Sequence, residues 1–182
     1  MREEKIYEKL CETTISLGKQ IQFQDQDIIN IVCDEGATSR VVIGSVEENF
    51  ESLLPGGTPR IIIVTDAKVH ANNLAFVNAH EHIVIGQGES SKTFVKLEEV
   101  YRQLLHMGAD RSTFIVGMGG GIVTDVTGFV ASTYMRGVRF GFLPTTLLAQ
   151  VDASIGGKNG VNLDGYKNII GVFNQPEFVL CD

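Results

Sequence analysis

The sequence of 182 residues lacks tryptophan, has only three cysteines and contains no apolar stretch long enough to cross a membrane, so no membrane partner is expected. Cys11, Cys33 and Cys181 lie far apart with no C-x-x-C pair, which favours reduced thiols in a cytoplasmic protein over a disulfide framework. No apolar segment near the amino terminus looks like a secretion signal. An excess of basic residues is also missing, because the formal net charge is −7, and this argues against a nucleic-acid partner.

Glycine is the residue present in excess. The chain has 20 glycines, whereas average usage of about 7% predicts roughly 13. Most of the excess lies between Gly117 and Gly171. The chain is 43% hydrophobic and has the length of one domain, so it can bury a core of its own.

From Thr38 onward, short apolar runs rich in β-branched residues alternate with helical patterns. The runs predict buried strands at 41–45, 60–66, 82–86, 113–119, 138–144 and 177–182. Strands and helices that alternate at this spacing predict an α/β fold, a Rossmann-like and mostly parallel sheet flanked by helices on both faces. Ligands of such sheets bind beyond the carboxyl ends of the strands.

The clearest helical pattern covers residues 92–108. Its apolar side chains recur at helical spacing, at Leu97, Val100, Tyr101, Leu104 and Leu105. Residues 1–37 read differently and are taken as an N-terminal extension of unknown role, ahead of an α/β domain over 38–182. A short helix marked by Ile6, Leu10 and Leu17 and a strand within 27–35 are expected in this extension.

The glycines at 117 and 119–121 close one predicted strand and open a helix. Bare backbone at this place lets a phosphate approach the N–H groups of a helix N-terminus. The spacing departs from the usual G-x-G-x-x-G pattern, because Ile122 stands where the third glycine belongs. The alternative is a glycine-rich turn that merely packs the helix against the sheet.

Two further strand ends carry charged residues. Asp66 ends a strand, where a carboxylate either binds the hydroxyls of a ribose or caps the following helix. Glu89 and Lys92 are three residues apart, which also suits a surface ion pair or a capping device.

The segment 136–168 combines four cations with carboxylate and amide side chains in an apolar setting. These residues are Arg136, Arg139, Lys158 and Lys167, together with Asp152, Asn162 and Asn168. Such a cluster in an acidic chain suggests a small anionic ligand, a phosphate or a carboxylate, and the alternative is a solvated loop. His80 and His82 flank Glu81, so a metal pair is conceivable, although two histidines without a third ligand are more often surface residues.

At these residues the sequence resembles a known family. The run GMGGGIVTDVTGFVASTYMRGVRFGFLPTTLLAQVDASIGGKNGVN, followed by YKNIIGVFNQP, is similar to the N-terminal, NAD-binding half of 3-dehydroquinate synthase. The similarity extends more weakly back to about Val41 through VTD and GESSK. It implies an enzyme of the shikimate pathway, and so of aromatic amino acid biosynthesis. Such an enzyme converts 3-deoxy-D-arabino-heptulosonate 7-phosphate, a phosphorylated seven-carbon keto sugar acid, to 3-dehydroquinate and phosphate by transient oxidation with NAD, elimination and aldol ring closure.

The resemblance also assigns residues. For the NAD site it implies Asp66, Lys68, Glu89, Lys92, Gly119, Gly120, Gly121, Asp125, Thr145 and Thr146. For catalysis and substrate binding it implies Arg136, Asp152, Lys158, Lys167 and Asn168. The sequence departs from the family pattern at Lys68, Thr124, Asn159 and Tyr166.

Family members use a divalent metal, zinc or cobalt, as a Lewis acid. The resemblance places its ligands in a helical C-terminal domain that no segment of this chain matches, so we expect no metal ligands here and no turnover by this chain alone. A homodimer is expected. The alternatives are a related sugar-phosphate cyclase with another substrate, a metal-dependent alcohol dehydrogenase, which would lack the run PTTLLAQVDASIGGK, and a free-standing NAD-binding module.

Overall fold

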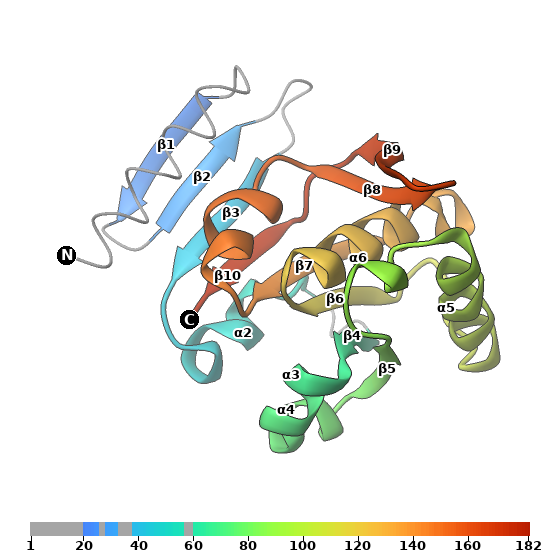
Figure 1. The fold of residues 1–182 in the computed structure, drawn as a ribbon. Helices are drawn as coiled ribbons and strands as arrows, with labels where there is room; N and C mark the ends of the chain where they lie inside the picture. Colours follow the sequence, from blue (N-terminus) through green and yellow to red (C-terminus); the bar gives the residue numbers. More distant parts are fainter. Residues whose placement is uncertain (1–19, 26–27, 33–37, 57–59) are drawn as a thin grey trace.

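A computed structural model describes residues 20–25, 28–32, 38–56 and 60–182 of the chain. An eight-stranded sheet dominates it, and a two-stranded sheet lies beside the large one (Figure 1). The strands are β1 (Gln20–Asp25), β2 (Ile28–Val32), β3 (Thr38–Ile43), β4 (Ile61–Asp66), β5 (Glu81–Ile85), β6 (Phe114–Gly119), β7 (Arg139–Pro144), β8 (Lys158–Leu163), β9 (Tyr166–Phe173) and β10 (Phe178–Cys181). The α-helices are α2 (Val46–Leu53), α3 (Ala67–Asn72), α4 (Leu74–Asn78), α5 (Phe94–His106) and α6 (Gly121–Thr133). Shorter turns of helix are η2 (Glu89–Ser91), η3 (Tyr134–Arg136) and η4 (Ala149–Ala153).

The large sheet has the strand order β1-β2-β3-β10-β7-β6-β4-β5. From β3 to β5 every pairing is parallel, whereas β2 pairs antiparallel with β3 and with β1. All six strands predicted after Thr38 are confirmed, as is a strand within 27–35, which is β2. Strand β1 was not predicted, and the helix expected around Ile6, Leu10 and Leu17 lies outside the described residues.

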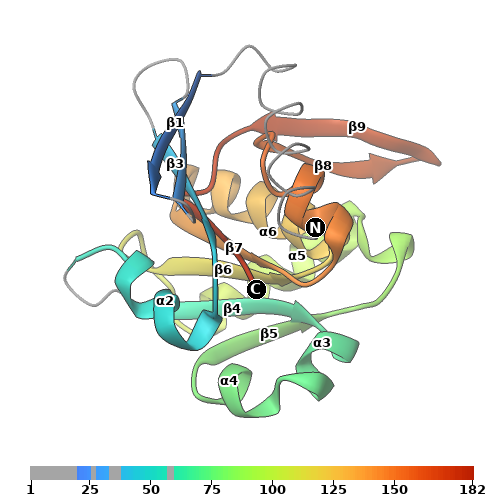
Figure 2. The same ribbon diagram turned by 90° about the vertical axis from the view of Figure 1, so that its left-hand side faces the viewer.

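Helices cover both faces of the sheet, as predicted for an α/β fold (Figure 2). The alternation of side chains along β4 shows how: Ile62 and Val64 belong to the core cluster that includes α5 and α6. Ile63, between them, belongs to the cluster that includes residues of α2 and α4. Successive strand residues point to opposite faces, so a continuous apolar run such as IIIV can only be accommodated by a sheet buried on both sides.

Helix α5 follows the predicted apolar pattern with one exception. Leu97, Val100 and Leu104 are buried against the sheet and Tyr101 is partly buried. Leu105 is 62% exposed, so its expected place on the buried stripe was wrong. It lies at the margin of the apolar face, where one further residue turns the side chain about 100° away from the sheet. No helix among the described residues has the length and apolar character needed to span a membrane.

The glycine-rich segment after Gly156, which the sequence suggested was a ligand loop, folds as a β-hairpin. Strands β8 and β9 pair antiparallel from Lys158 opposite Phe173 to Leu163 opposite Tyr166, and β8 packs along α6. Asp164 and Gly165 form the two-residue turn, with φ of 49° and 83°. Before the hairpin, Ala149–Ala153 forms a short π-helix that contacts α6.

Candidate functional site

The connections that follow β4 and β6 leave the sheet in opposite directions. β4 leads through α3 and α4 to β5 on one side, and β6 leads through α6 to β7 on the other. The two strands are neighbours, with Thr65 of β4 opposite Met118 of β6, so Asp66 lies beside the glycine turn. Where neighbouring connections diverge in this way, a crevice opens beyond the carboxyl ends of the strands, and open α/β sheets bind ligands there.

The glycine turn lies at the centre of this crevice. β6 ends at Gly119, Gly120 is the N-cap residue of α6, and α6 begins at Gly121. A glycine at the N-cap offers no side chain to bond the first N–H groups of the helix, so these groups remain available to an anion. A Cβ added at Gly120 would lie 3.3 Å from Cγ2 of Thr146, and one at Gly121 would lie 3.3 Å from Cβ of Ala153. Side chains there would fill the space over the helix N-terminus.

Gly119, in contrast, is required for packing. A Cβ at this position would lie 2.5 Å from Cγ2 of Val123, one turn into α6. Close helix packing therefore accounts for Gly119, whereas Gly120 and Gly121 leave open the space over the helix N-terminus, and the anion site there stays a prediction.

Asp66 caps helix α3. Its Oδ1 accepts hydrogen bonds from the backbone N–H groups of Lys68 at 2.8 Å and Val69 at 2.9 Å. Among the contacts of the described residues, none involves Oδ2 of Asp66, and the residue lines two cavities. Capping and ligand binding are thus compatible, since they use different oxygens of one carboxylate.

Two adjoining cavities form the crevice. The larger one, of about 770 Å³, extends from α2 and α3 across the carboxyl ends of β4, β6, β7 and β10. The smaller one, of about 270 Å³, lies over the turn after β5 and the glycine turn. Asp66, Lys68 and Thr146 line both, and Thr145 lines the larger, whereas Gly120 and Gly121 line the smaller.

Lys92 carries the densest polar network of the site. It is 4% exposed, and its ammonium contacts the Asp125 carboxylate and Oδ1 of Asn168. It does not pair with Glu89, so the surface ion pair that the spacing allowed was the wrong alternative. Glu89 instead accepts a hydrogen bond from Nδ2 of Asn162 at 2.8 Å.

Asp125 has a perturbed acidity. Burial raises the pKa of its carboxyl, and the charges of Glu89 and Asp152 raise it further, while the ammonium of Lys92 acts in the opposite direction. A partly buried carboxylate with a shifted pKa beside a buried lysine is characteristic of functional sites. Glu89 and Asp152 therefore lie close enough for their charges to act on the Asp125 carboxyl.

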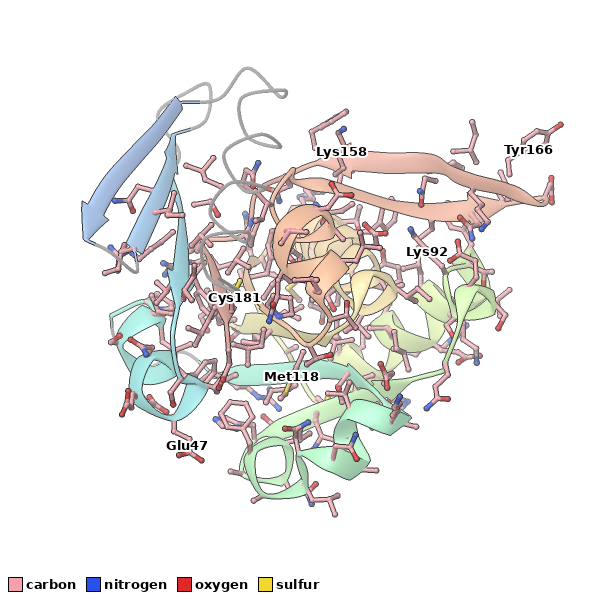
Figure 3. The ribbon with its side chains drawn as sticks, turned by 60° about the vertical axis from the view of Figure 1, so that its left-hand side comes forward. Glu47, Lys92, Met118, Lys158, Tyr166 and Cys181 are labelled. Atoms are coloured by element: carbon pink, nitrogen blue, oxygen red, sulfur yellow. The ribbon has the colours of Figure 1, made fainter. Side chains whose placement is uncertain are left out.

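The residues assigned to substrate binding do not all gather here. Asp152 is exposed on η4, near Asp125, and the exposed Lys167 adjoins Asn168 in β9. Lys158 starts β8, about 13 Å along the strand from Asn162 at ~3.3 Å per residue. Figure 3 labels Lys158 and Tyr166 at opposite ends of the hairpin.

Two arginines of the predicted cationic cluster lie toward the amino ends of the strands, away from the crevice. Arg136 follows the end of α6, and a helix of this length holds its two ends about 20 Å apart. Arg139 starts β7 and forms a bidentate ion pair with Glu177. The expectation of one cluster of four cations around a ligand was therefore wrong, because Arg136 lies at the end of α6 away from the glycine turn and Arg139 is paired with Glu177 at the start of β7.

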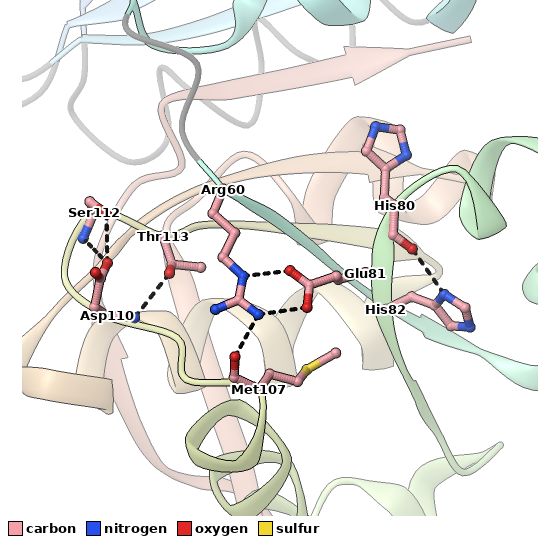
Figure 4. Close-up of polar contacts among 8 residues, drawn as sticks. All are labelled: Arg60, His80, Glu81, His82, Met107, Asp110, Ser112 and Thr113. Carbon is pink, nitrogen blue, oxygen red and sulfur yellow. Dashed lines mark hydrogen bonds and ion pairs between the residues drawn. The ribbon is translucent and has the colours of Figure 1, made fainter.

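The histidine pair does not form a metal site. Arg60 occupies the carboxylate of Glu81 and also donates to the Met107 carbonyl, and the imidazoles of His80 and His82 point apart (Figure 4). The His80 ring packs against Phe50 and Phe76, and the His82 ring against His70. Across the described ranges, no three His, Cys, Asp or Glu side chains converge in a way that could hold a metal ion.

Two asparagines take places that the sequence did not reveal. Asn162 forms hydrogen bonds with the side chain of Glu89 and the backbone of Asn168. The sequence placed it in the polar segment but gave it no role. Its position two residues before the hairpin turn was the signal that could have indicated one. Asn159, one of the departures from the family pattern, is 3% exposed and donates to the carbonyls of Gly157 and Asn174. It is a packing residue, so its difference from the family does not bear on the ligand.

Comparison with known proteins identifies relatives of this chain. A family model described as 3-dehydroquinate synthase N-terminal matches residues 82–182. The 3-dehydroquinate synthase of Rhodospirillum rubrum is 46% identical over 132 residues, which make up 68% of this chain and 34% of that protein. The chain thus spans about a third of the length of the curated relatives it matches.

Solved structures share the fold. A 2-deoxy-scyllo-inosose synthase complexed with carbaglucose-6-phosphate, NAD⁺ and Co²⁺ is similar with a TM-score of 0.76 and 27% identity, over 85% of this chain and 45% of that one. A 2-epi-5-epi-valiolone synthase from Streptomyces hygroscopicus, with NAD⁺ and Zn²⁺ bound, is similar with a TM-score of 0.65 and 29% identity, over 78% and 42%.

Proposed function

Because this chain belongs to the 3-dehydroquinate synthase N-terminal family, we propose that it is the NAD-binding portion of an enzyme converting 3-deoxy-D-arabino-heptulosonate 7-phosphate to 3-dehydroquinate and phosphate. The observation that carries the proposal is the crevice at the ends of β4 and β6, which Asp66 and the glycine turn line, with the Lys92–Asp125 pair about one turn further along α6. Residues 38–182 are the NAD-binding unit, and β1 and β2 add an edge to its sheet.

The crevice suits the pyrophosphate and adenosine ribose of NAD. Gly120 and Gly121 leave room for a phosphate at the N-terminus of α6, whose dipole favours negative charge. Asp66 offers its Oδ2 to a ribose hydroxyl while Oδ1 caps α3. Lys68, which lines both cavities, adds a positive charge for the phosphates, and Thr145 and Thr146 line the opposite wall.

The nicotinamide end falls to Glu89, Lys92 and Asp125. The ammonium of Lys92 compensates the charge of the partly buried Asp125 carboxylate. The charged form of Asp125 can therefore accept a hydrogen bond from a ribose hydroxyl. Bound NAD would supply the hydride acceptor for an alcohol of the substrate, and the ketone so formed would make the proton on the neighbouring carbon acidic.

Asp152 acts on Asp125, Asn168 contacts Lys92, and Lys167 adjoins Asn168 in β9, so we assign these three residues to the substrate. Lys167 suits its phosphate or carboxylate. We do not assign Arg136 and Lys158 to the substrate. Arg136 follows the C-terminal end of α6, and Lys158 lies at the end of the hairpin away from its turn.

The metal found in the two solved relatives has no ligand set among the described residues of this chain. No step of the reaction is therefore assigned here to a metal. We further propose a cytoplasmic homodimer: the buried free thiol of Cys181 suits a reducing compartment, and exposed apolar side chains on β9, Ile169 at 61% and Phe173 at 85%, suit a contact between copies. Sedimentation of the chain at several concentrations tests the dimer.

Calorimetric titration of the chain with NAD tests the cofactor site. We expect saturable binding that Gly120→Val weakens by at least about tenfold, because the added side chain fills the cradle beside Thr146. Gly56→Val is the matched control, since a Cβ at Gly56 meets no atom within 4 Å. No binding by the parent chain, or equal binding by Gly120→Val, would contradict the site.

A second candidate is a related sugar-phosphate cyclase, favoured by the likeness to 2-deoxy-scyllo-inosose synthase. Its sequence identity of 27% is well below the 46% shared with a 3-dehydroquinate synthase. Phosphate release by the whole protein decides: release from the seven-carbon keto sugar acid supports the first function, and release from glucose 6-phosphate supports the second.

A further inference from the structure

Asn162, near the end of β8, joins three parts of the site that no local sequence links. Its backbone N–H donates to the Lys92 carbonyl at 2.8 Å. Its side-chain Nδ2 donates to Oε1 of Glu89 at 2.8 Å, and its Oδ1 accepts the backbone N–H of Asn168 at 2.9 Å. Asn162 therefore links the turn after β5 to both strands of the hairpin.

These bonds hold both partners of a contact that Asn162 does not itself make. The Lys92 ammonium contacts Oδ1 of Asn168 as well as Asp125. Lys92 is held through its carbonyl and Asn168 through its amide, in each case by Asn162. Asn168 has a φ of 52°, in the left-handed region, which asparagine adopts more readily than most residues other than glycine, and the bond from its backbone N–H to Asn162 stabilises this conformation.

We infer that Asn162 is a positioning residue: its carboxamide holds the backbone of Asn168, whose Oδ1 contacts the Lys92 ammonium beside Asp125, and it orients Glu89 beside the cofactor. The inference rests on the proposed function only for the cofactor; the placement of Lys92 stands on the hydrogen bonds alone. Asn162 acts through Glu89, Lys92 and Asn168.

A purely structural role, in which Asn162 merely fastens the hairpin, makes a different prediction. The chain offers a matched control in Asn174, just beyond the other end of the hairpin. Its Nδ2 donates to Oγ of Ser132 at 2.9 Å, so it also ties the hairpin segment to α6, but away from Lys92. A fastening role predicts similar effects for the two alanine variants, whereas a positioning role predicts effects at Asp125 for Asn162→Ala alone.

The first test follows the Asp125 carboxyl by carbon-13 NMR titration of the chain without ligand. The charged groups facing Asp125 are Lys92, Glu89 and Asp152. In Asn162→Ala the backbone bond to the Lys92 carbonyl remains, but the Asn168 backbone is no longer held, so the Asn168 Oδ1 no longer fixes the Lys92 ammonium. The midpoint of Asp125 then rises by about one pH unit, whereas Asn174→Ala leaves it unchanged. Equal midpoints in the parent and in a folded Asn162→Ala variant would overturn the inference.

The second test measures NAD affinity calorimetrically. Asn162→Ala binds about tenfold more weakly than the parent, and Asn174→Ala binds like the parent. If Asn162→Ala does not fold, the isosteric Asn162→Asp replaces it: this variant keeps an acceptor for the Asn168 amide and loses the donor to Glu89, so wild-type affinity in it would count against the inference. A parent chain that binds no NAD refutes the proposed function, while the Asp125 titration still decides on Asn162.

Discussion

Gly128, in the middle of α6, is where the hairpin packs most closely against the helix. A Cβ added there would lie 1.9 Å from Oδ1 and 2.3 Å from Cγ of Asn159. Asn159 is 3% exposed, and its Nδ2 donates to the carbonyls of Gly157 at 3.0 Å and Asn174 at 2.8 Å. Gly128→Ala therefore has to displace a buried, hydrogen-bonded carboxamide.

The expected cost follows from these contacts. Losing two hydrogen bonds costs about 1 kcal/mol each, and forcing an extra methyl into a packed interface costs roughly 1–3 kcal/mol. Alanine is the better helix former by about 1 kcal/mol, which offsets part of this. The net destabilisation of Gly128→Ala is then about 3 kcal/mol, equivalent to a Tm about 10 °C lower for a chain of this size.

Urea unfolding of four proteins measures the effect: the parent, Gly128→Ala, Asn159→Ala and the double variant. In the Asn159→Ala background the three atoms nearest the new Cβ are gone. The Gly128→Ala change then becomes neutral, or stabilising by up to about 1 kcal/mol, through helix propensity. Gly56→Ala, with open space around its Cβ, serves as a control for the glycine-to-alanine change itself. The same cost for Gly128→Ala in both backgrounds would refute the steric reasoning.

Three further changes probe the site and the core. Asp66→Ala removes the acceptor for two N–H groups of α3 and lowers the free energy of unfolding by about 1 kcal/mol. Asp66→Asn keeps that acceptor and should be more stable than Asp66→Ala. Equal Tm values of the two variants in thermal unfolding would contradict the cap. Burial raises the pKa of Asp125 above its ordinary 3.8, so the folded chain holds this proton more tightly than the unfolded chain does. That stabilisation is complete below pH 3.8 and is lost as the pH rises through the folded pKa. Relative to Asp125→Asn, the parent therefore loses unfolding free energy over this range, and parallel urea midpoints in a pH series would disprove it. Burial raises the pKa of the Cys181 thiol to about 12. In a variant with Cys11→Ser and Cys33→Ser, a thiol reagent at neutral pH should therefore label the chain only after it unfolds. Rapid labelling of the folded chain would contradict the burial of Cys181.

Most of the large sheet was predictable because its signals are local. A run such as IIIV, at residues 61–64, is apolar and β-branched throughout, and only a strand buried on both faces accommodates it. The hairpin was missed although Asp164 and Gly165 form a recognised two-residue turn signal. Its strands are rich in glycine and polar residues, and β9 is largely exposed, so the apolar alternation that marks a strand is weak.

The candidate site was predictable in its parts and not in its pairings. The sequence placed Lys92 within reach of Glu89, whereas the folded chain brings it to Asp125 and Asn168, 33 and 76 residues away. It also grouped Arg136 and Lys158 with Lys167, although Arg136 follows the C-terminal end of α6 and Lys158 and Lys167 lie toward opposite ends of the hairpin.

The sequence by itself determined the parallel α/β sheet, the glycine turn at the start of α6 and the residues at the strand ends, because each depends on neighbours within a few positions. Only the tertiary structure decided which charges meet. The packing of the hairpin on α6 sets the distance between Lys92, Asp125 and Asn168, and the rigid length of α6 keeps Arg136 away from the crevice. Contacts between distant segments depend on how whole elements pack, and no local pattern in the chain encodes that packing.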